Sequence, residues 1–420
     1  MLDPATKRDE RVNLWVKDGV IEFCEPGETQ LDSDTETINA DSLVAAPGFI
    51  DMSSDFGDRG YEYKEGLLNG AKAAVNGGFT DVVISPNTDP VIDNGTVIEY
   101  IKNKTFDLPV SIHCAGAVTK ELKGEHITQM LEMNDHGAVY FTNADKSIPT
   151  TQVLKRAFDY ASSKDLLIAE HAEDKSLADN SSMNESALSH KLGLKGFPHI
   201  AEEIIVSRDI LMAEYCGNRR LHFKRISTAY STELIREAKN RELRISAETS
   251  PHYFYFDQNK VTSFKTYYKV NPPLREKDDI NALIKALKEN VIEVITSDHK
   301  PAALHEKDVE FENAPYGING MEATVGLSID ALYHKNKMEL IDVVAKFTSN
   351  PRKLMKLDQV SFDKGSEAKI TILDPEKEWI YSKENSLSSA TNNPYEHMKI
   401  KGKPEYVING VHLFKSVLGK

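Results

Sequence analysis

Cysteine is scarce in this chain of 420 residues, and its three cysteines, Cys24, Cys114 and Cys216, are far apart. Without a C-x-x-C pair they provide neither a disulfide framework nor a thiolate zinc site, so we expect them to be packing residues in a reducing cytoplasm. A long apolar run is also lacking. No window approaches the roughly 18 apolar residues that span a bilayer, and the first residues do not resemble a signal peptide. These absences predict a cytoplasmic protein that does not enter a membrane.

Positive charge is in deficit, with 51 basic against 65 acidic residues and a formal net charge of −14. Affinity for phosphate backbones and anionic lipid surfaces comes mainly from Lys and Arg, so this balance argues against nucleic acid and membrane partners. A hydrophobic content of 40% in a chain of this length can bury one large core and a smaller second one. We therefore expect two domains.

Both ends of the chain are rich in strand patterns. The alternating run 12–17 meets the turn Asp18-Gly19 and is followed by a second run at 20–23, which is typical of a β-hairpin. Near the C-terminus, similar runs occupy 369–373, 406–408 and 411–414. The pattern predicts one small β domain built from both termini, over residues 1–47 and 360–420.

Residues 48–359 alternate strand-like apolar runs with helical segments, which is the pattern of βα units around a parallel sheet. The clearest runs lie at 80–84, 110–113, 138–141, 166–169, 244–247 and 291–295. No G-x-G-x-x-G follows the first strand, so a (β/α)₈ barrel of the TIM type fits better than a doubly wound sheet. The predicted fold is therefore an α/β barrel with a small β-sandwich domain.

A series of short motifs runs through the chain in a specific order. They include Pro47-Gly48-Phe49-Ile50-Asp51, Glu170-His171-Ala172-Glu173-Asp174, Ile226-Ser227-Thr228-Ala229, Val270-Asn271-Pro272-Pro273 and Ser297-Asp298-His299-Lys300-Pro301. In this order and spacing the chain resembles the dihydroorotases of the amidohydrolase superfamily over nearly its whole length. The resemblance implies a barrel that opens a cyclic amide at zinc, which lowers the pKa of a bound water and polarises the carbonyl.

The positions that bind metal in that family are largely occupied by other residue types. The His-x-His of the first strand is replaced by Ser53 and Asp55, and we expect Asp55 to be hydrogen-bonded or ion-paired inside the barrel mouth. The bridging acidic ligand is replaced by the neutral Asn143. Asp145, two residues further on, could substitute for it if the loop shifts, but is expected to be a solvated loop residue.

Only two of the remaining ligand positions keep the residue type of the family. His171 matches a histidine ligand and Asp298 matches the aspartate that transfers the proton, whereas the next ligand is replaced by Arg225. A guanidinium is always charged and repels a metal, so no metal is expected. We expect Arg225 to pair with Asp55 or Asp298; the alternative is an arginine turned to solvent.

The positions that contact substrate in the family are only partly kept. Asn87 and Asn271 remain, and either a vestigial binding role or a local backbone role is open for each. The arginine that neutralises the substrate carboxylate is replaced by Gly57, and a histidine with the same role is replaced by Ala302. Loss of both metal and carboxylate binding argues against dihydroorotase activity.

Three functional hypotheses follow. The leading one is a catalytically silent dihydroorotase homologue, resembling the degenerate homologues that assemble with some bacterial aspartate transcarbamoylases. The second is a working amidohydrolase that holds one zinc ion with Asp55, His171 and Asp298. The third is a metal-free protein that binds a small anion through Arg225. The resemblance also implies a homodimer, although no segment of the sequence marks an interface.

Overall fold

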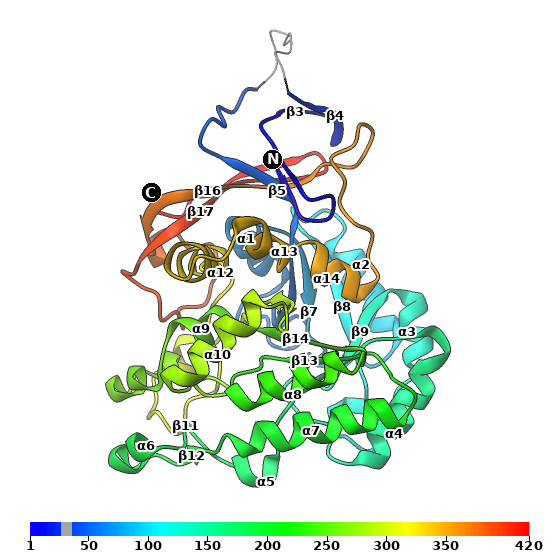
Figure 1. Ribbon diagram of the computed structural model, residues 1–420, viewed down its shortest axis with the longest axis vertical. Helices are drawn as coiled ribbons and strands as arrows, with labels where there is room; N and C mark the ends of the chain where they lie inside the picture. Colours follow the sequence, from blue (N-terminus) through cyan, green and yellow to red (C-terminus); the bar gives the residue numbers. More distant parts are fainter. Residues whose placement is uncertain (27–35, 420) are drawn as a thin grey trace.

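The computed structural model describes residues 1–26 and 36–419, and its central element is a sheet of eight parallel strands (Figure 1). Neighbours in the sheet follow chain order from the first strand to the last. The strands are β6 (Phe49–Ser54), β7 (Phe79–Ile84), β8 (Ser111–Ala117), β9 (Ala138–Thr142), β10 (Ile168–His171), β13 (Leu221–Lys224), β14 (Ile245–Thr249) and β15 (Val294–Ile295).

The sheet closes on itself where its first strand meets the segment after its last. Ser54 at the end of β6 forms a parallel bridge with His299, and the backbone N–H of Asp55 donates to the His299 carbonyl at 2.8 Å. Because all eight strands are parallel, their carboxyl ends meet at one mouth. The predicted (β/α)₈ barrel is confirmed.

Amphipathic helices cover the outside of the barrel (Figure 1). In α4 (Thr151–Ala161), the buried Val153, Leu154, Ala157 and Phe158 recur at helical spacing and face the strands, and the Thr150 hydroxyl caps the first turn by accepting from the Val153 N–H. The longer helices are α1 (Leu67–Asn76), α2 (Gly95–Thr105), α3 (Met130–His136), α7 (Ile200–Tyr215), α8 (Ala229–Asn240), α10 (Lys277–Lys288) and α14 (Ser349–Met355).

Shorter elements fill the connections between strands. The short helices are α5 (Lys175–Ala178), α6 (Ala187–Leu192), α9 (Pro251–Tyr255), α11 (Leu304–Lys307), α12 (Thr324–Ser328) and α13 (Leu340–Ala345), with a π-helical turn η5 (Ile329–Lys335). Short 3₁₀ helices are η1 (Lys120–Leu122), η2 (Ser162–Lys164), η3 (Gln258–Ser263), η4 (Thr266–Tyr268) and η6 (Lys383–Asn385), and β11 (Met183–Asn184) pairs with β12 (Gly196–Phe197).

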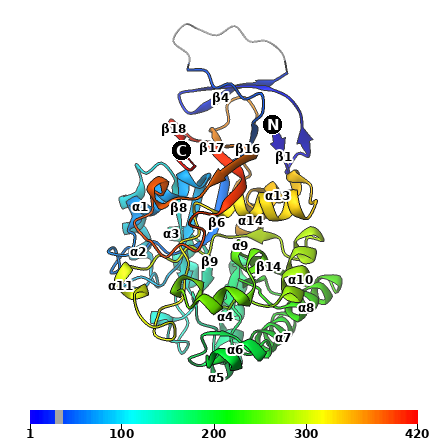
Figure 2. The ribbon, with the colours of Figure 1, turned by 90° about the vertical axis from the view of Figure 1, so that its left-hand side faces the viewer.

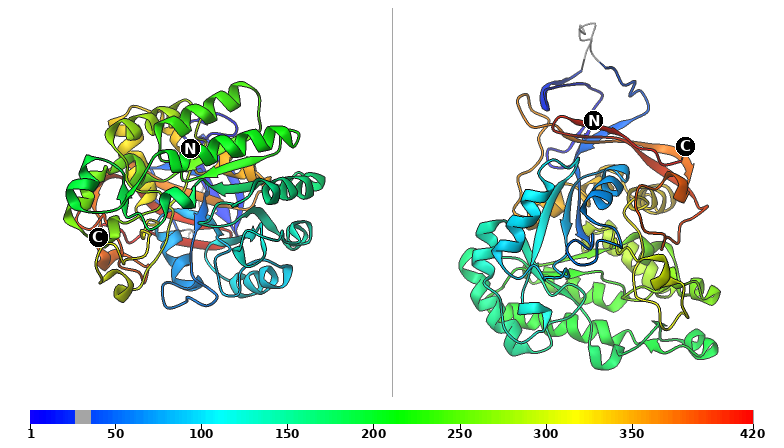
Figure 3. Two further views of the ribbon diagram at one scale, coloured as in Figure 1. Left: turned by 90° about the horizontal axis from the view of Figure 1, so that it is seen from below. Right: turned by 180° about the vertical axis from the view of Figure 1, so that it is seen from behind.

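A small antiparallel β layer lies at one end of the barrel and takes strands from both ends of the chain (Figure 2). Its main sheet has the order β18-β17-β16-β5, and both chain termini lie near it (Figure 3). The strands of this layer are β1 (Leu2–Asp3), β2 (Arg8–Asp9), β3 (Asn13–Lys17), β4 (Val20–Glu25), β5 (Val44–Pro47), β16 (Lys369–Ile380), β17 (Lys399–Asn409) and β18 (His412–Lys415).

This layer agrees with the sandwich predicted from both termini. The expected hairpin is the antiparallel pair β3–β4, and β5 from the N-terminal side pairs with β16 from the C-terminal side. The boundaries 1–47, 360–420 and 48–359 stay a prediction, and residues 27–35 and 420 lie outside the described residues.

Two further observations concern the chain as a whole. Cys24, Cys114 and Cys216 are free and buried. In the described ranges 1–26 and 36–419, every helix is too short or too polar to cross a bilayer.

Candidate functional site

The residues singled out in the sequence come together at the carboxyl ends of the barrel strands. Ser53 lies in β6 and His171 ends β10, whereas Asn143, Arg225 and Asp298 each follow a strand, namely β9, β13 and β15. Because parallel strands end on the same side of a barrel, residues distant in sequence share one mouth.

Arg225 lies inside this mouth. Its side chain is 2% exposed, and its Nη1 donates to Asp145 Oδ1 at 2.6 Å and to Asp298 Oδ1 at 2.9 Å. The backbone at Arg225 has φ 53° and at Asp298 has φ 46°, which is the left-handed region that non-glycine residues seldom adopt. The alternative of an arginine turned to solvent is therefore wrong.

Asp145 was expected to be a solvated loop residue; its side chain is 31% exposed, but both of its carboxylate oxygens are ion-paired. Besides Arg225, the Lys300 ammonium donates to its second carboxylate oxygen, so two cations hold one carboxylate. Burial raises the pKa of Asp145, but Lys300 and Arg225 outweigh it and hold the pKa well below its ordinary value. The sequence misled because Asp145 reaches its partners only through contacts between separate loops.

The pKa of Asp298 is also lowered by neighbouring side chains. Burial raises its pKa, but the charges of Arg225 and His252 lower it well below the ordinary range. His252 Nε2 lies 3.5 Å from Asp298 Oδ2. Asp298 is therefore an ionised carboxylate across the whole neutral range.

Asp55 is not the partner of Arg225 in this structure. It is partly exposed, and its Oδ2 accepts from Asn87 Nδ2 at 2.9 Å. Burial raises the pKa of Asp55, and the charge of Lys300 opposes that rise. The expected hydrogen-bonded carboxylate is thus observed, with an amide donor in place of the guanidinium.

A second amide–carboxylate contact lies beside His171. Asn271 Nδ2 donates to Glu173 Oε2 at 2.7 Å, and His171 Nε2 lies 3.0 Å from the same oxygen. Burial and the charge of Arg225 lower the pKa of His171. Sequence reasoning missed Glu173 as a partner, although its place two residues after His171 in Glu-His-Ala-Glu-Asp was a signal.

Asn143, which replaces the bridging acidic ligand of the family, is hydrogen-bonded to Thr119. Asn143 Oδ1 accepts from the backbone N–H of Thr119 at 3.1 Å and from its hydroxyl at 3.0 Å. The side chain is 1% exposed. Asn143 therefore ties the end of β9 to the loop after β8.

Lys224 is a further cation that the sequence did not single out. It ends β13, is 2% exposed, and has a pKa lowered by burial and by the charge of Arg225. The feature of the sequence that could have identified Lys224 was its place directly before Arg225, at the end of a strand that the structure shows to be fully buried.

The two positions that lack the family's carboxylate-binding residues are tightly packed. Gly57 has φ 69°, and a Cβ there would lie 2.6 Å from the Tyr61 carbonyl oxygen. The backbone N–H of the buried Ala302 donates to Asn392 Oδ1 at 3.1 Å. An arginine at position 57 therefore requires a different local path of the chain.

These residues do not fit a zinc site. Within residues 1–26 and 36–419, no three His, Cys, Asp or Glu side chains are arranged to hold a metal ion. The buried cations Arg225 and Lys224 lie among the carboxylates instead, and their charge opposes a divalent ion.

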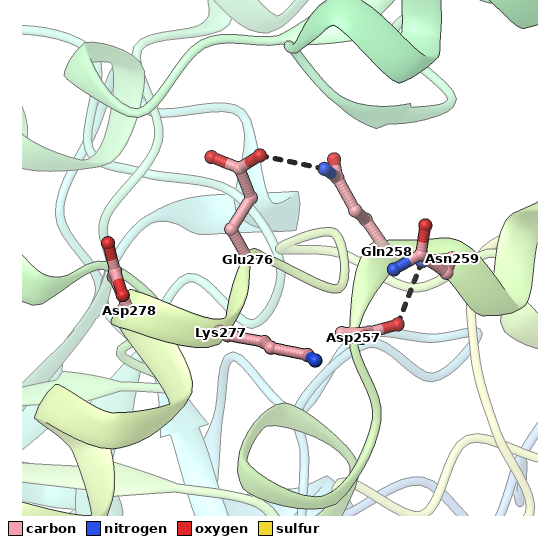
Figure 4. A pocket seen from close by; sticks show the side chains of 6 residues that line it. All are labelled: Asp257, Gln258, Asn259, Glu276, Lys277 and Asp278. Atoms are coloured by element: carbon pink, nitrogen blue, oxygen red, sulfur yellow. Dashed lines mark hydrogen bonds between the residues drawn. The ribbon is translucent and has the colours of Figure 1, made fainter.

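A surface hollow of about 310 Å³ lies elsewhere, between η3 and the start of α10 (Figure 4). Its polar side chains bond to one another: Gln258 Nε2 donates to Glu276 Oε1 at 2.9 Å, and Asp257 accepts from the Asn259 N–H at 3.0 Å. No residue singled out in the sequence lines this hollow.

Comparison with known proteins places the barrel in a family. The family described as dihydro-orotase-like matches residues 42–233. A protein named dihydroorotase from Syntrophus aciditrophicus is 36% identical over 404 residues, covering 96% of this chain and 94% of its own. Another of the same name, from Acetivibrio thermocellus, is 37% identical over 417 residues, covering 98% and 96%.

Solved structures share the fold at lower sequence identity. The L-hydantoinase of Arthrobacter aurescens superposes with a TM-score of 0.85 at 21% identity, covering 97% of this chain and 93% of its own. The dihydropyrimidinase of Brevibacillus agri superposes with a TM-score of 0.84 at 20% identity, covering 100% and 94%. Taken with the full-length sequence relatives, the chain belongs to the dihydroorotase family.

Proposed function

We propose that this chain is a catalytically inactive, cytoplasmic member of the dihydroorotase family whose barrel is a structural partner of aspartate transcarbamoylase. The observation that carries the proposal is the position of Arg225, which joins Asp145 and Asp298 at the centre of the barrel mouth. Buried free cysteines are typical of a reducing compartment.

The charges at the mouth support catalytic silence. Arg225 and Lys300 lower the pKa values of Asp145 and Asp298, so these two carboxylates are ionised without a divalent ion. Asp298 is a poor general base, because efficient proton transfer requires a pKa near the working pH and its pKa is far lower.

The test is turnover together with metal content. Protein purified without chelator is assayed for dihydroorotate formation and hydrolysis and analysed for bound metal, with the Syntrophus aciditrophicus relative prepared in parallel as the positive control. We expect no turnover above the reaction without enzyme and less than stoichiometric zinc. Stoichiometric zinc with measurable turnover instead supports the reduced site of Asp55, His171 and Asp298 and ends the proposal.

The partnership rests on the resemblance to inactive dihydroorotase homologues that assemble with transcarbamoylases. It is tested by tagging this chain in its source cells and, separately, tagging the catalytic transcarbamoylase subunit. Each tagged protein is expected to recover the other in a fixed ratio. Recovery of each tagged protein without the other contradicts the partnership while leaving the question of catalysis open.

One observation favours a second candidate function, the binding of a small anion. The Nε and Nη2 groups of Arg225 are buried and have no hydrogen-bond partner in residues 1–26 and 36–419. A carboxylate or phosphate is the ligand that such a guanidinium recognises. Thermal shift with phosphate, orotate and carbamoyl aspartate tests this, with Arg225→Met as the control. A flat response across the panel dismisses it.

A further inference from the structure

Residues 386–393 form an irregular segment between η6 and β17, here called the strap. Near its start, the Ser388 hydroxyl donates to Glu65 Oε2 in the loop after β6 at 2.7 Å. Near its end, Asn392 Nδ2 donates to the Lys300 carbonyl in the segment after β15 at 2.9 Å. Because β6 and β15 are the first and last strands of the barrel, the strap lies across the rim of the mouth where the sheet closes.

Two buried carboxylates hold the first half of the strap. Four consecutive residues, 386–389, donate hydrogen bonds to Glu65 or Glu322, which are 2% and 1% exposed. Glu322 also accepts from Asn76 Nδ2 and from the Tyr381 hydroxyl, so both of its oxygens have donors. Glu65 Oε1 is buried and has no hydrogen-bond partner among residues 1–26 and 36–419. A negative charge on Glu65 is therefore the less compensated of the two.

The surroundings of Glu65 favour its protonated form. Burial raises the pKa of Glu65 to about 7, and the like charge of Glu322, which precedes α12, adds to the rise. The strap supplies only serine hydroxyls, which oppose the rise in part. On the loop after β6, the Lys64 ammonium pairs with Glu306 at 2.9 Å. On the segment before η6, the Tyr381 hydroxyl donates to Glu322 rather than to Glu65.

The second half of the strap holds a loop of the mouth. Besides the Lys300 carbonyl, Asn392 Nδ2 donates to the Gly317 carbonyl at 3.1 Å, and Asn392 Oδ1 accepts from the Ala302 N–H at 3.1 Å. The Asn392 side chain is buried. The Lys300 ammonium donates to Asp145 at the centre of the mouth. The strap therefore fixes the backbone of a residue whose side chain belongs to the candidate site.

We propose that the strap is a pH-responsive closure of the barrel mouth, bound to the rim while Glu65 is protonated and released when Glu65 ionises. In the closed form an ionised Glu65 is buried beside Glu322 with one oxygen unpaired, whereas opening of the strap brings the carboxylate into water. Release of 386–389 also loosens Asn392, so the loop that carries Lys300 loses the hydrogen bonds that fix it.

The direction and size of the response follow from proton linkage. The carboxyl of Glu65 has a pKa of about 7 in the closed form and 4.5 in water, so the closed form is fully favoured below pH 4.5 and loses this advantage as pH rises through 7. Each unit of difference in pKa is a factor of ten in the opening equilibrium. The opening constant is therefore expected to rise about tenfold between pH 6 and pH 8 and to level off above that.

The first test is amide hydrogen exchange of the wild-type chain at pH 6, 7 and 8, corrected for the intrinsic pH dependence of exchange. The reporting amides are Leu387 in the strap, and Ala302 and Asn319, which donate to Asn392. We expect all three to exchange faster than the buried strand β9 at each pH, and their opening to rise about tenfold from pH 6 to pH 8. Exchange no faster than that of β9, or opening that does not change with pH, overturns the proposal. A rise confined to Leu387 overturns the opening of the mouth.

Variants assign the response to Glu65. Glu65→Gln keeps the shape of the side chain and removes the titration, so its strap is expected to open to the same extent at pH 6 and pH 8. Glu384→Gln is the matched control, because Glu384 is exposed in η6 beside the strap, and it is expected to keep the tenfold rise. A rise that persists in Glu65→Gln overturns the proposal.

Asn392→Ala separates the two halves of the strap. It removes the acceptor of the Ala302 N–H, so exchange at Ala302 is expected to be fast at every pH, while Leu387 keeps its rise from pH 6 to pH 8. Protection of Ala302 that is unchanged in this variant overturns the coupling of the strap to the mouth loop. The wild-type pH series decides the proposal by itself if a variant fails to fold, and none of these measurements depends on catalysis or on a transcarbamoylase.

Discussion

Arg225 Nη1 lies 2.9 Å from Asp298 Oδ1, so a cation that follows β13 contacts a carboxylate that follows β15. Both side chains are almost fully buried, at 2% and 7% exposed. A buried pair of this kind is costly to break, because removing one partner leaves the other charge without compensation. The stability of the barrel mouth therefore depends on Arg225.

Arg225→Met is expected to destabilise the protein strongly. Methionine fills a similar volume but leaves the buried Asp298 without the guanidinium and the partly exposed Asp145 with Lys300 as its remaining cation, at a cost of about 3–5 kcal/mol in the free energy of unfolding. Urea denaturation measures the change.

The control for this variant is a solvent-exposed ion pair. Lys155 and Asp159 are paired at 2.6 Å on the surface of α4, with side chains 45% and 50% exposed, so Lys155→Met is expected to cost less than about 1 kcal/mol. Equal losses for the two variants contradict the structural role of Arg225. Adding Asp145→Asn and Asp298→Asn to Arg225→Met is expected to recover part of the loss.

The contact between Asn87 and Asp55 is expected to behave as a coupled pair. Asn87→Ala removes the amide donor at 2.9 Å and leaves the carboxylate with one hydrogen bond fewer. A double-mutant cycle with Asp55→Ala measures a coupling in unfolding free energy of about 0.5–1 kcal/mol, at the low end because both residues are partly exposed. Additive effects of the two substitutions argue that the contact contributes nothing to the fold.

The stability is expected to carry a pH dependence from Glu65. Burial raises its pKa to about 7, and it accepts from the Ser388 hydroxyl at 2.7 Å. Between the unfolded value of 4.5 and 7 the folded state binds a proton that the unfolded state does not, so this contribution to stability falls as pH rises through that window.

Glu65→Gln removes this titration while keeping the shape of the side chain. The free energy of unfolding of the variant, relative to that of the wild type, is therefore expected to rise by on the order of 2 kcal/mol between pH 5 and pH 8. Thermal melting at both pH values checks it, with Glu25→Gln as an exposed control. A constant difference between Glu65→Gln and wild type across the range contradicts the raised pKa.

Metal binding is expected to return when imidazoles are supplied together. The triple substitution Ser53→His, Asp55→His and Arg225→His removes the guanidinium and joins three histidines to His171, which is a ligand set that suits zinc. Metal analysis is expected to find zinc in the triple variant and far less in Arg225→His alone. A triple variant that is folded by circular dichroism yet binds no zinc indicates that the surrounding mouth, including Lys224, excludes a metal.

The sequence by itself determined the architecture. Apolar runs of strand length alternate with amphipathic helical segments, and this local periodicity predicts a barrel without long-range information. It also determined which residue types stand at the ligand positions, such as Ser53 and Arg225, because those are read directly from the motifs.

Only the tertiary structure decided how these side chains pair. The sequence predicted Asp55 or Asp298 as the partner of Arg225 and placed Asp145 in solvent, whereas in the structure Arg225 contacts both Asp145 and Asp298. The loop after β9 brings Asp145 to Arg225, which lies 80 residues away in the chain. The choice depends on the turns after strands, where Ala144, Arg225 and Asp298 all adopt positive φ, and such loop geometry is set by long-range packing rather than by local pattern.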